Sequence, residues 1–195
     1  MRSLLLGSAF AAAFLAACGS ETPVAPVTAP ATSAAVTSTF SASPPPAQHN
    51  AACDLLTSAE VAAYNDGAPI TPRGSLSGPT NGASGLPVSI DICTWQADLA
   101  NNAGPSIQVE MTTARTVAEA RKEFDALVAA IVKNTAPGAT AVPVRGIGEE
   151  AQTVGEWIVV RHGTAVLSIA GTPARGDTRA MLEALAANAA GRIGR

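Results

Sequence analysis

Three cysteines constrain this chain of 195 residues more than any other feature of its sequence. Cys18 ends an apolar run near the N-terminus, whereas Cys53 and Cys93 lie farther along, about 40 residues apart. Thiols form disulfides outside the cytoplasmic membrane and stay reduced in the cytoplasm, so whether a cysteine pairs depends on the compartment. The N-terminal segment sets that compartment and, with it, the constraints on the fold.

The N-terminus has the pattern of a secretory signal. Arg2 supplies a short positive segment, and residues 4–17 form an apolar run. As a helix this run would be about 21 Å long, which is short of a hydrocarbon core of ~30 Å. The pattern therefore predicts a cleaved signal peptide over residues 1–17 rather than a membrane span.

Residues 15–18, Leu-Ala-Ala-Cys, resemble the bacterial lipobox, at which signal peptidase II cuts just before the cysteine. The resemblance implies a diacylglycerol on the sulfur of Cys18 and an acyl chain such as palmitate on its amine. Two or three acyl chains anchor firmly, since each buried CH₂ contributes ~0.8 kcal/mol. We expect a lipoprotein of the cell membrane, held on the extracytoplasmic face. The alternative is an ordinary secretory signal with a chance cysteine.

Lipidation of Cys18 leaves Cys53 and Cys93, and outside the cytoplasmic membrane these two thiols are expected to pair. Closing a loop of about 40 residues is worth ~4 kcal/mol in the chain-entropy model. The alternative is two unpaired buried thiols. No metal site is expected, because the two cysteines lack CxxC spacing and the only histidines are His49 and His162.

Residues 18–51 are predicted to be a tether between anchor and domain. The segment is rich in Pro, Thr, Ser and Ala, carries one charge, Glu21, and has no hydrophobic period. Fully extended, it would reach about 100 Å from the membrane. Its composition also resembles that of O-glycosylated stalks, so the tether is either glycosylated or bare. The chain has a net charge of −3 and no basic patch, so nucleic acid is not an expected partner.

Residues 52–195 are predicted to fold as one domain. Capping patterns indicate a short helix from Thr57 and longer helices over 116–134 and 177–193. Alternating residues predict a hairpin of strands 89–97 and 106–113. Further short strands are predicted at 139–144, 150–155, 156–163 and 164–171. This order favours an α+β fold: an antiparallel sheet of about five strands, built from a hairpin and a meander, with two longer helices and one short N-terminal helix.

Two regions of the domain carry further expectations. Residues 66–89 are rich in glycine and proline and are predicted to be a long loop, either a mobile connection or a binding loop. In the helix over 116–134, the charged residues, Glu123 among them, are assigned to the solvent face.

Four segments in order resemble one family: CDLLTSAEV, CTWQ, ARTVAEARKEFDAL and PVRGIGEEA. The chain resembles the actinobacterial lipoproteins grouped as domain of unknown function 3558 (DUF3558), over about residues 52–190. The resemblance implies a secreted, lipid-anchored protein and supports pairing of Cys53 with Cys93. It supplies no catalytic residues. Glu149 stands where aspartate is commoner in the family.

No catalytic set or cofactor site is expected. Residues 146–151 fit a loose GxGxxA pattern, but Glu149 and Glu150 would oppose a pyrophosphate. The two carboxylates, as neighbours in an extended chain, are expected to point to opposite faces. His162 has no nucleophile motif to serve and is predicted to lie in a surface turn. The chain is therefore predicted not to be an enzyme.

Trp95 and Trp157 lie in predicted strands, where they serve the core or contact a ligand. The expected function is non-catalytic binding of an envelope protein, glycan or lipid on a flexible stalk. The alternative is a lipid or small-ligand carrier with an internal pocket, and an enzyme is the less favoured reading. A deep apolar pocket would favour the carrier, and a flat apolar patch would favour a protein partner.

Overall fold

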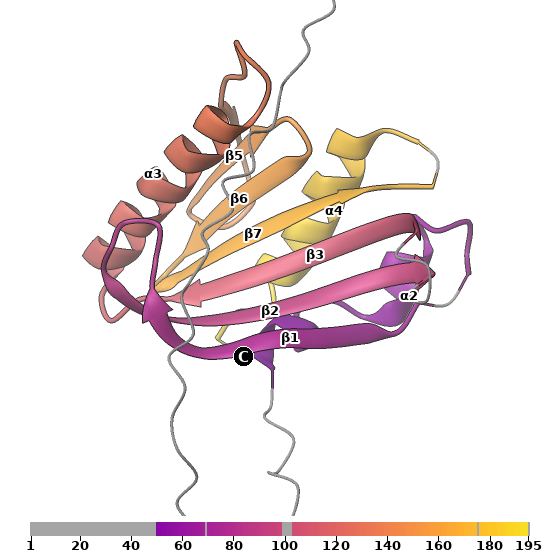
Figure 1. The fold of residues 1–195 in the computed structure, drawn as a ribbon, viewed down its shortest axis with the longest axis horizontal. Coiled ribbons are helices and arrows are strands. Elements are labelled where there is room, and N and C mark those ends of the chain that lie inside the picture. The colour runs from indigo at the N-terminus through magenta and orange to yellow at the C-terminus, as the bar shows by residue number, and fades with distance from the viewer. Residues whose placement is uncertain (1–49, 69, 99–102, 175, 195) are drawn as a thin grey trace, which may run out of the picture. The chain divides into compact units, whose positions relative to one another are not determined.

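The computed structural model describes residues 50–68, 70–98, 103–174 and 176–194 (Figure 1). The predicted signal peptide, Cys18 and nearly all of the predicted tether lie outside these residues. The helices are α1 (Ala51–Asp54), α2 (Ser58–Ala62), α3 (Val117–Asn134) and α4 (Thr178–Ala190). The strands are β1 (Pro72–Asn81), β2 (Pro87–Asp98), β3 (Ala103–Thr113), β4 (Val142–Val144), β5 (Glu150–Val154), β6 (Trp157–His162) and β7 (Ala165–Thr172).

In the described residues the strands form one seven-stranded sheet in the order β1-β2-β3-β7-β6-β5-β4, and every pairing is antiparallel. The chain runs through β1, β2 and β3, crosses along α3 to the far edge, and returns through β4, β5 and β6 to β7. The pairing of β3 with β7 joins the two meanders. The predicted α+β class and antiparallel sheet are confirmed, but the expected number of about five strands is too low.

The predicted loop over residues 66–89 is wrong for residues 72–81, which form strand β1, and for residues 87–89, which begin β2. This strand lies at the edge of the sheet, where proline is tolerated because one side of the backbone has no strand to pair with. The register shifts between Gly74 and Leu76, which is a β-bulge. The side-chain amide of Asn50 donates to the carbonyls of Leu76 and Ile92 there, each at 2.9 Å. Glycine and proline thus mark an irregular edge strand rather than a loop.

One face of the sheet is covered by α1, α2 and α4, which lie behind it in Figure 1. Cys93 and Trp95 of β2 point into this core, where α4 contributes Met181, Leu182 and Leu185. The predicted disulfide is present: Cys53 of α1 bonds Cys93, with an S–S distance of 2.05 Å. The disulfide therefore joins α1 covalently to β2.

The other face is covered only in part within the described residues. Helix α3 packs Phe124, Val128 and Ile131 against a cluster that includes Val159 of β6 and Val166 of β7. On the same face, β1, β2 and most of β3 lie beside α3 rather than beneath it (Figure 1). The sheet therefore has a half with three layers, around β5, β6 and β7, and a half with two layers, around β1, β2 and β3.

The helix starts follow the predicted caps. Thr57 and Glu60 form a complete capping box at α2, and the carboxylate of Asp177 accepts from Ala180 N at α4. At α3 the hydroxyl of Thr116 accepts from Glu119 N, but the carboxylate of Glu119 pairs with Arg115 instead of closing the box. Among the described helices, none is long and apolar enough to cross a membrane.

Candidate functional site

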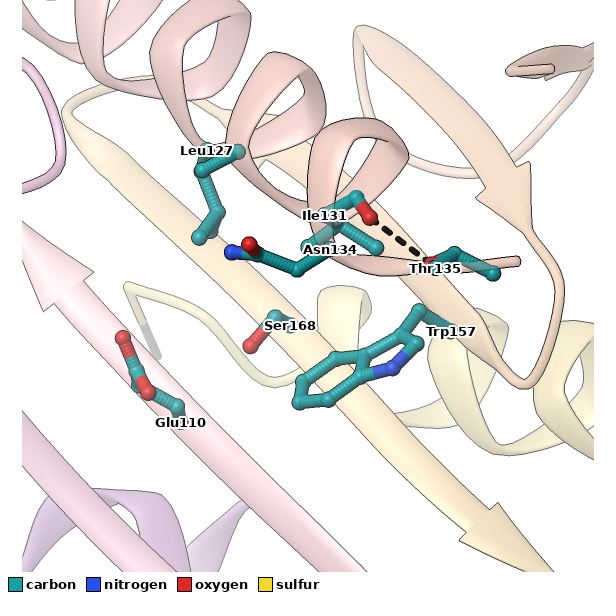
Figure 2. A pocket seen from close by; sticks show the side chains of 8 residues that line it. Glu110, Leu127, Ile131, Asn134, Thr135, Trp157 and Ser168 are labelled. Atoms are coloured by element: carbon teal, nitrogen blue, oxygen red, sulfur yellow. Dashed lines mark hydrogen bonds between the residues drawn. The ribbon is translucent and has the colours of Figure 1, made fainter. Parts of the chain in front are cut away.

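A groove of about 320 Å³ lies between the C-terminal half of α3 and the sheet (Figure 2). Its floor comes from three adjacent strands: Glu110 on β3, Ser168 on β7 and Trp157 on β6. Glu110 and Ser168 are direct partners in the ladder, and Trp157 pairs with Ala170, two residues after Ser168. Side chains two residues apart share a face of a strand, so these three emerge on one side of the sheet.

The wall of the groove is one face of α3. Ala130 and Ile131 lie three and four residues after Leu127, and Asn134 lies four and three residues after them, which places all four along a single stripe of the helix. Thr135, the C-cap residue of α3, completes the lining, and its hydroxyl donates to the carbonyl of Ile131 at 2.7 Å (Figure 2). The groove therefore lies at the C-terminal end of α3, where the helix dipole is negative.

The turn between β1 and β2 fixes the position of α3. Glu123 is 2 % exposed, and its carboxylate accepts from the backbone N–H groups of Ala83 and Ser84, at 2.6 and 2.9 Å. The hydroxyl of Ser84 donates to the same carboxylate. A Cβ on Gly82 would clash with the carboxylate of Glu123, so a larger residue there would displace that carboxylate from its hydrogen bonds. We call residues 82–84 and Glu123 the α3 clamp.

The assignment of Glu123 to the solvent face of its helix is therefore wrong. Its carboxylate is buried, and the hydrogen bonds of the clamp offset the loss of water. The sequence carries no signal of this, because the partners lie about 40 residues upstream, in a segment predicted to be a long loop. Only the glycine-rich stretch at residues 82–85 hints at a turn whose backbone could approach a carboxylate.

Glu110 is the single charged residue among the eight described residues that line the groove. The side chain is half-buried, and burial raises its pKa above the usual range for glutamate, with a further contribution from the negative charge of Glu123. Other charges of α3 are directed elsewhere: Arg121 pairs with Glu150, and Asp125 lines a different cavity. The groove therefore has negative electrostatic character.

The two tryptophans have different places in the structure. Trp95 is fully buried in the core beneath α4, and its Nε1 has no hydrogen-bond partner among the described residues. It offers no surface to a ligand from solvent, so its role is in the core. Trp157 is partly exposed, and its ring extends into the groove near Ser168 (Figure 2). Of the two tryptophans, Trp157 is the one placed to contact a ligand.

An open sheet face continues from the floor of the groove. Leu76, Ile92, Glu110 and Ser168 are successive partners across β1, β2, β3 and β7. Leu76 is 51 % exposed, and Ile92 is half-buried. This row is a shallow apolar path that leads from the sheet edge to the carboxylate of Glu110.

Within the segment PVRGIGEEA, residues 145–149 form a structural turn, as predicted, and the ends of the segment belong to β4 and β5. The guanidinium of Arg161 is buried and binds the carboxylates of both Glu149 and Glu150. A Cβ on Gly148, where φ is +59°, would lie 2.5 Å from a methyl group of Val160. The expectation that the two carboxylates diverge is wrong, because Glu149 belongs to the turn and not to the strand.

Two further candidate residues, Glu149 and His162, lie outside the groove. The N–H of Gly163 and then Arg161 lower the pKa of Glu149, so this carboxylate is occupied by structural contacts. His162 is exposed at the end of β6, consistent with the predicted surface turn. Among the described residues, no group of three or more His, Cys, Asp or Glu side chains could hold a metal ion.

No family model matches the chain, and no curated protein and no solved structure matches it either. The relation to DUF3558 therefore stays a prediction that rests on the four sequence segments and their order.

Proposed function

We propose that this chain is a non-catalytic binding domain of the cell envelope, anchored to the membrane through Cys18, and that the groove under α3 is its recognition site. The observation that carries the proposal is the convergence, in one groove, of a half-buried carboxylate, an indole ring and an apolar helix face. Ligand sites commonly combine apolar walls with a few polar groups in this way.

The lining supports binding rather than catalysis. Apart from Glu110, the polar side chains among its described residues are Ser168, Asn134, Thr135 and the indole of Trp157. A general acid–base mechanism needs a titratable partner within reach of the reacting atoms, and a nucleophile needs an adjacent base. Glu110 is the single carboxylate among the described residues of the lining, and it accepts no hydrogen bond from the neighbouring hydroxyl of Ser168.

The size of the groove bears on the alternative of a carrier. Four described cavities have volumes of 230–370 Å³, and the groove is one of them. Small-ligand sites start at about 300 Å³, and sites for larger ligands reach ~1,000 Å³. These volumes favour a small molecule or one end of a larger one over a fully enclosed lipid.

A photo-cross-linking experiment tests the recognition site. A benzophenone amino acid at Asn134, in the groove, is expected to form an adduct in intact cells that export the protein. The same amino acid at Lys122, exposed elsewhere on α3, is the matched control. Loss of the Asn134 adduct on adding Trp157→Ala would support the groove, whereas equal labelling at both positions would contradict it.

A second experiment tests the anchor. Cys18→Ala is expected to release the protein from the membrane fraction or to leave it unprocessed, because no sulfur remains for the diacylglycerol. Cys53→Ala is the control that removes a thiol without touching the lipobox. A Cys18→Ala protein that stays in the membrane at normal mature mass would contradict lipidation.

A further inference from the structure

We infer that the groove selects a small organic cation, an ammonium or guanidinium group carried on an apolar body, with Glu110 as its counter-ion. The inference rests on the proposed function, because it names the ligand class of the same groove.

The charges around the groove favour a cation. Glu110 has no cationic partner among the described residues, and the buried Glu123 adds a second negative charge nearby. The C-terminal end of α3 contributes partial negative charge from its last carbonyls. Lys133 lies in that last turn, but it is exposed and does not line the groove. An anionic ligand would meet repulsion from all three sources.

The hydrogen-bonding state of Glu110 also favours a donor ligand. Its carboxylate accepts no hydrogen bond from another described residue, although burial has removed part of its water. A half-buried carboxylate without a donor bears a desolvation cost, which a charge-assisted hydrogen bond from a ligand would offset. The oxygens of Ser168 and Asn134 line the same space and can accept further N–H bonds (Figure 2).

The remaining lining suits the apolar part of such a ligand. Leu127, Ala130 and Ile131 form an aliphatic wall on α3. The indole of Trp157 faces the groove, and tryptophan is the aromatic side chain that attracts cations best. A ligand with a positive head and a short apolar body would therefore match both the floor and the wall.

Proton linkage gives this site a characteristic pH dependence. The groups facing Glu110 are Ile92 from β2, Ser168 from β7, and Leu127, Asn134 and Glu123 from α3. Only Glu123 among them is charged, and together with burial it raises the pKa of Glu110. A bound cation would favour the ionised carboxylate, so affinity is expected to fall as pH decreases through the pKa of Glu110.

Three probes of equal chain length and different head charge test the selectivity: n-hexylammonium, hexanol and hexanoate. Binding to the purified protein is followed by amide and indole NMR shifts at the groove. Hexylammonium is expected to shift these signals at the lowest concentration and hexanoate at the highest. Glu110→Gln should weaken hexylammonium binding about tenfold, or ~1.4 kcal/mol, and leave hexanol binding unchanged. Asp125→Asn, which removes a carboxylate from α3 outside the groove, should change neither.

The outcomes separate this inference from the proposed function. If all three probes bind alike and Glu110→Gln has no effect, the groove is a binding site without charge selectivity, and the inference is overturned. If hexanoate binds best, the groove selects anions, and the inference is overturned. If no probe shifts a groove signal, the inference is overturned, and the cross-linking at Asn134 decides separately whether the groove is the recognition site.

Discussion

The two halves of the sheet differ in how many of their faces are covered, and burial along their strands differs accordingly. In β6, Ile158, Val159 and Val160 are all fully buried, because α4 lies on one face and α3 on the other. In β2, burial alternates: Cys93 is fully buried and the adjacent Ile92 is half-buried. A strand covered on both faces tolerates little change, whereas a strand covered on one face leaves the other free to evolve contacts.

One of the largest effects is expected from the disulfide, which holds the two-layer half to α1. Reducing the Cys53–Cys93 bond, whose sequence separation is 40, should lower the free energy of unfolding by ~4 kcal/mol in the chain-entropy model. Urea unfolding with and without a phosphine reductant measures the change. The Cys53→Ala/Cys93→Ala protein should be indifferent to the reductant. An unchanged midpoint in the wild-type protein would mean that the two-layer half needs no covalent support.

A matched pair of isoleucines tests the comparison most directly. Ile158→Ala, in the three-layer half, should cost about 2–5 kcal/mol of unfolding free energy, because it leaves a cavity between two packed layers. Ile92→Ala, on the open sheet face, should cost less than half as much, since water can fill the space. Urea unfolding of the two variants gives the loss of unfolding free energy for each. Equal costs would contradict the division of the sheet into two kinds of packing.

The α3 clamp lies where the two halves meet, and its removal should have an intermediate effect. Glu123→Gln replaces one acceptor oxygen by an NH₂ group that faces the N–H of Ala83 or Ser84. The buried mismatch should cost about 1–3 kcal/mol. Chemical denaturation of this variant is compared with that of Asp125→Asn, an exposed carboxylate on the same helix. Equal stability of the two variants would show that the clamp does not hold α3 in place.

The smallest effect is expected from Glu60 of α2 and Arg192, which follows α4. Hydrogen bonding to Arg192 is the main cause that lowers the pKa of Glu60, to about 2 from 4.5. A lowered pKa stabilises the fold above the unfolded-state value and loses that contribution as pH falls from about 4.5 to 2. Solvent screening limits the effect to less than about 1 kcal/mol. Unfolding measured from pH 6 to 2 should show a shallower loss of stability for Glu60→Gln.

The part of the fold that local chemistry determines was predictable. Side-chain caps at Thr57, Thr116 and Asp177 mark the helix starts, and alternating or continuous apolar residues mark the strands around Trp95 and Trp157. Strand β1 was not predictable in this way, because an edge strand accepts the prolines and glycines that elsewhere end a strand. Its pairing with β2 is a tertiary property.

The candidate site depends on contacts that the sequence does not encode locally. Glu110 looks like a polar residue in an alternating strand, and its role depends on β7 and α3, which lie far along the chain. Trp157 was selected from the sequence together with Trp95, and composition could not separate them. Their environments differ because α3 ends beside Trp157, whereas Trp95 points to the opposite face, beneath α4.

The position of β7 has a consequence for the order in which the chain can fold. Among the described strands, β7 comes last in the sequence, yet it lies at the centre of the sheet and pairs with β3. A chain that emerges with its N-terminus first exposes β1, β2 and β3 well before residues 165–172 arrive. The sheet therefore cannot close until most of the chain has emerged, and β3 must wait with one edge unpaired. Completion of this topology depends on the last strand rather than on the first.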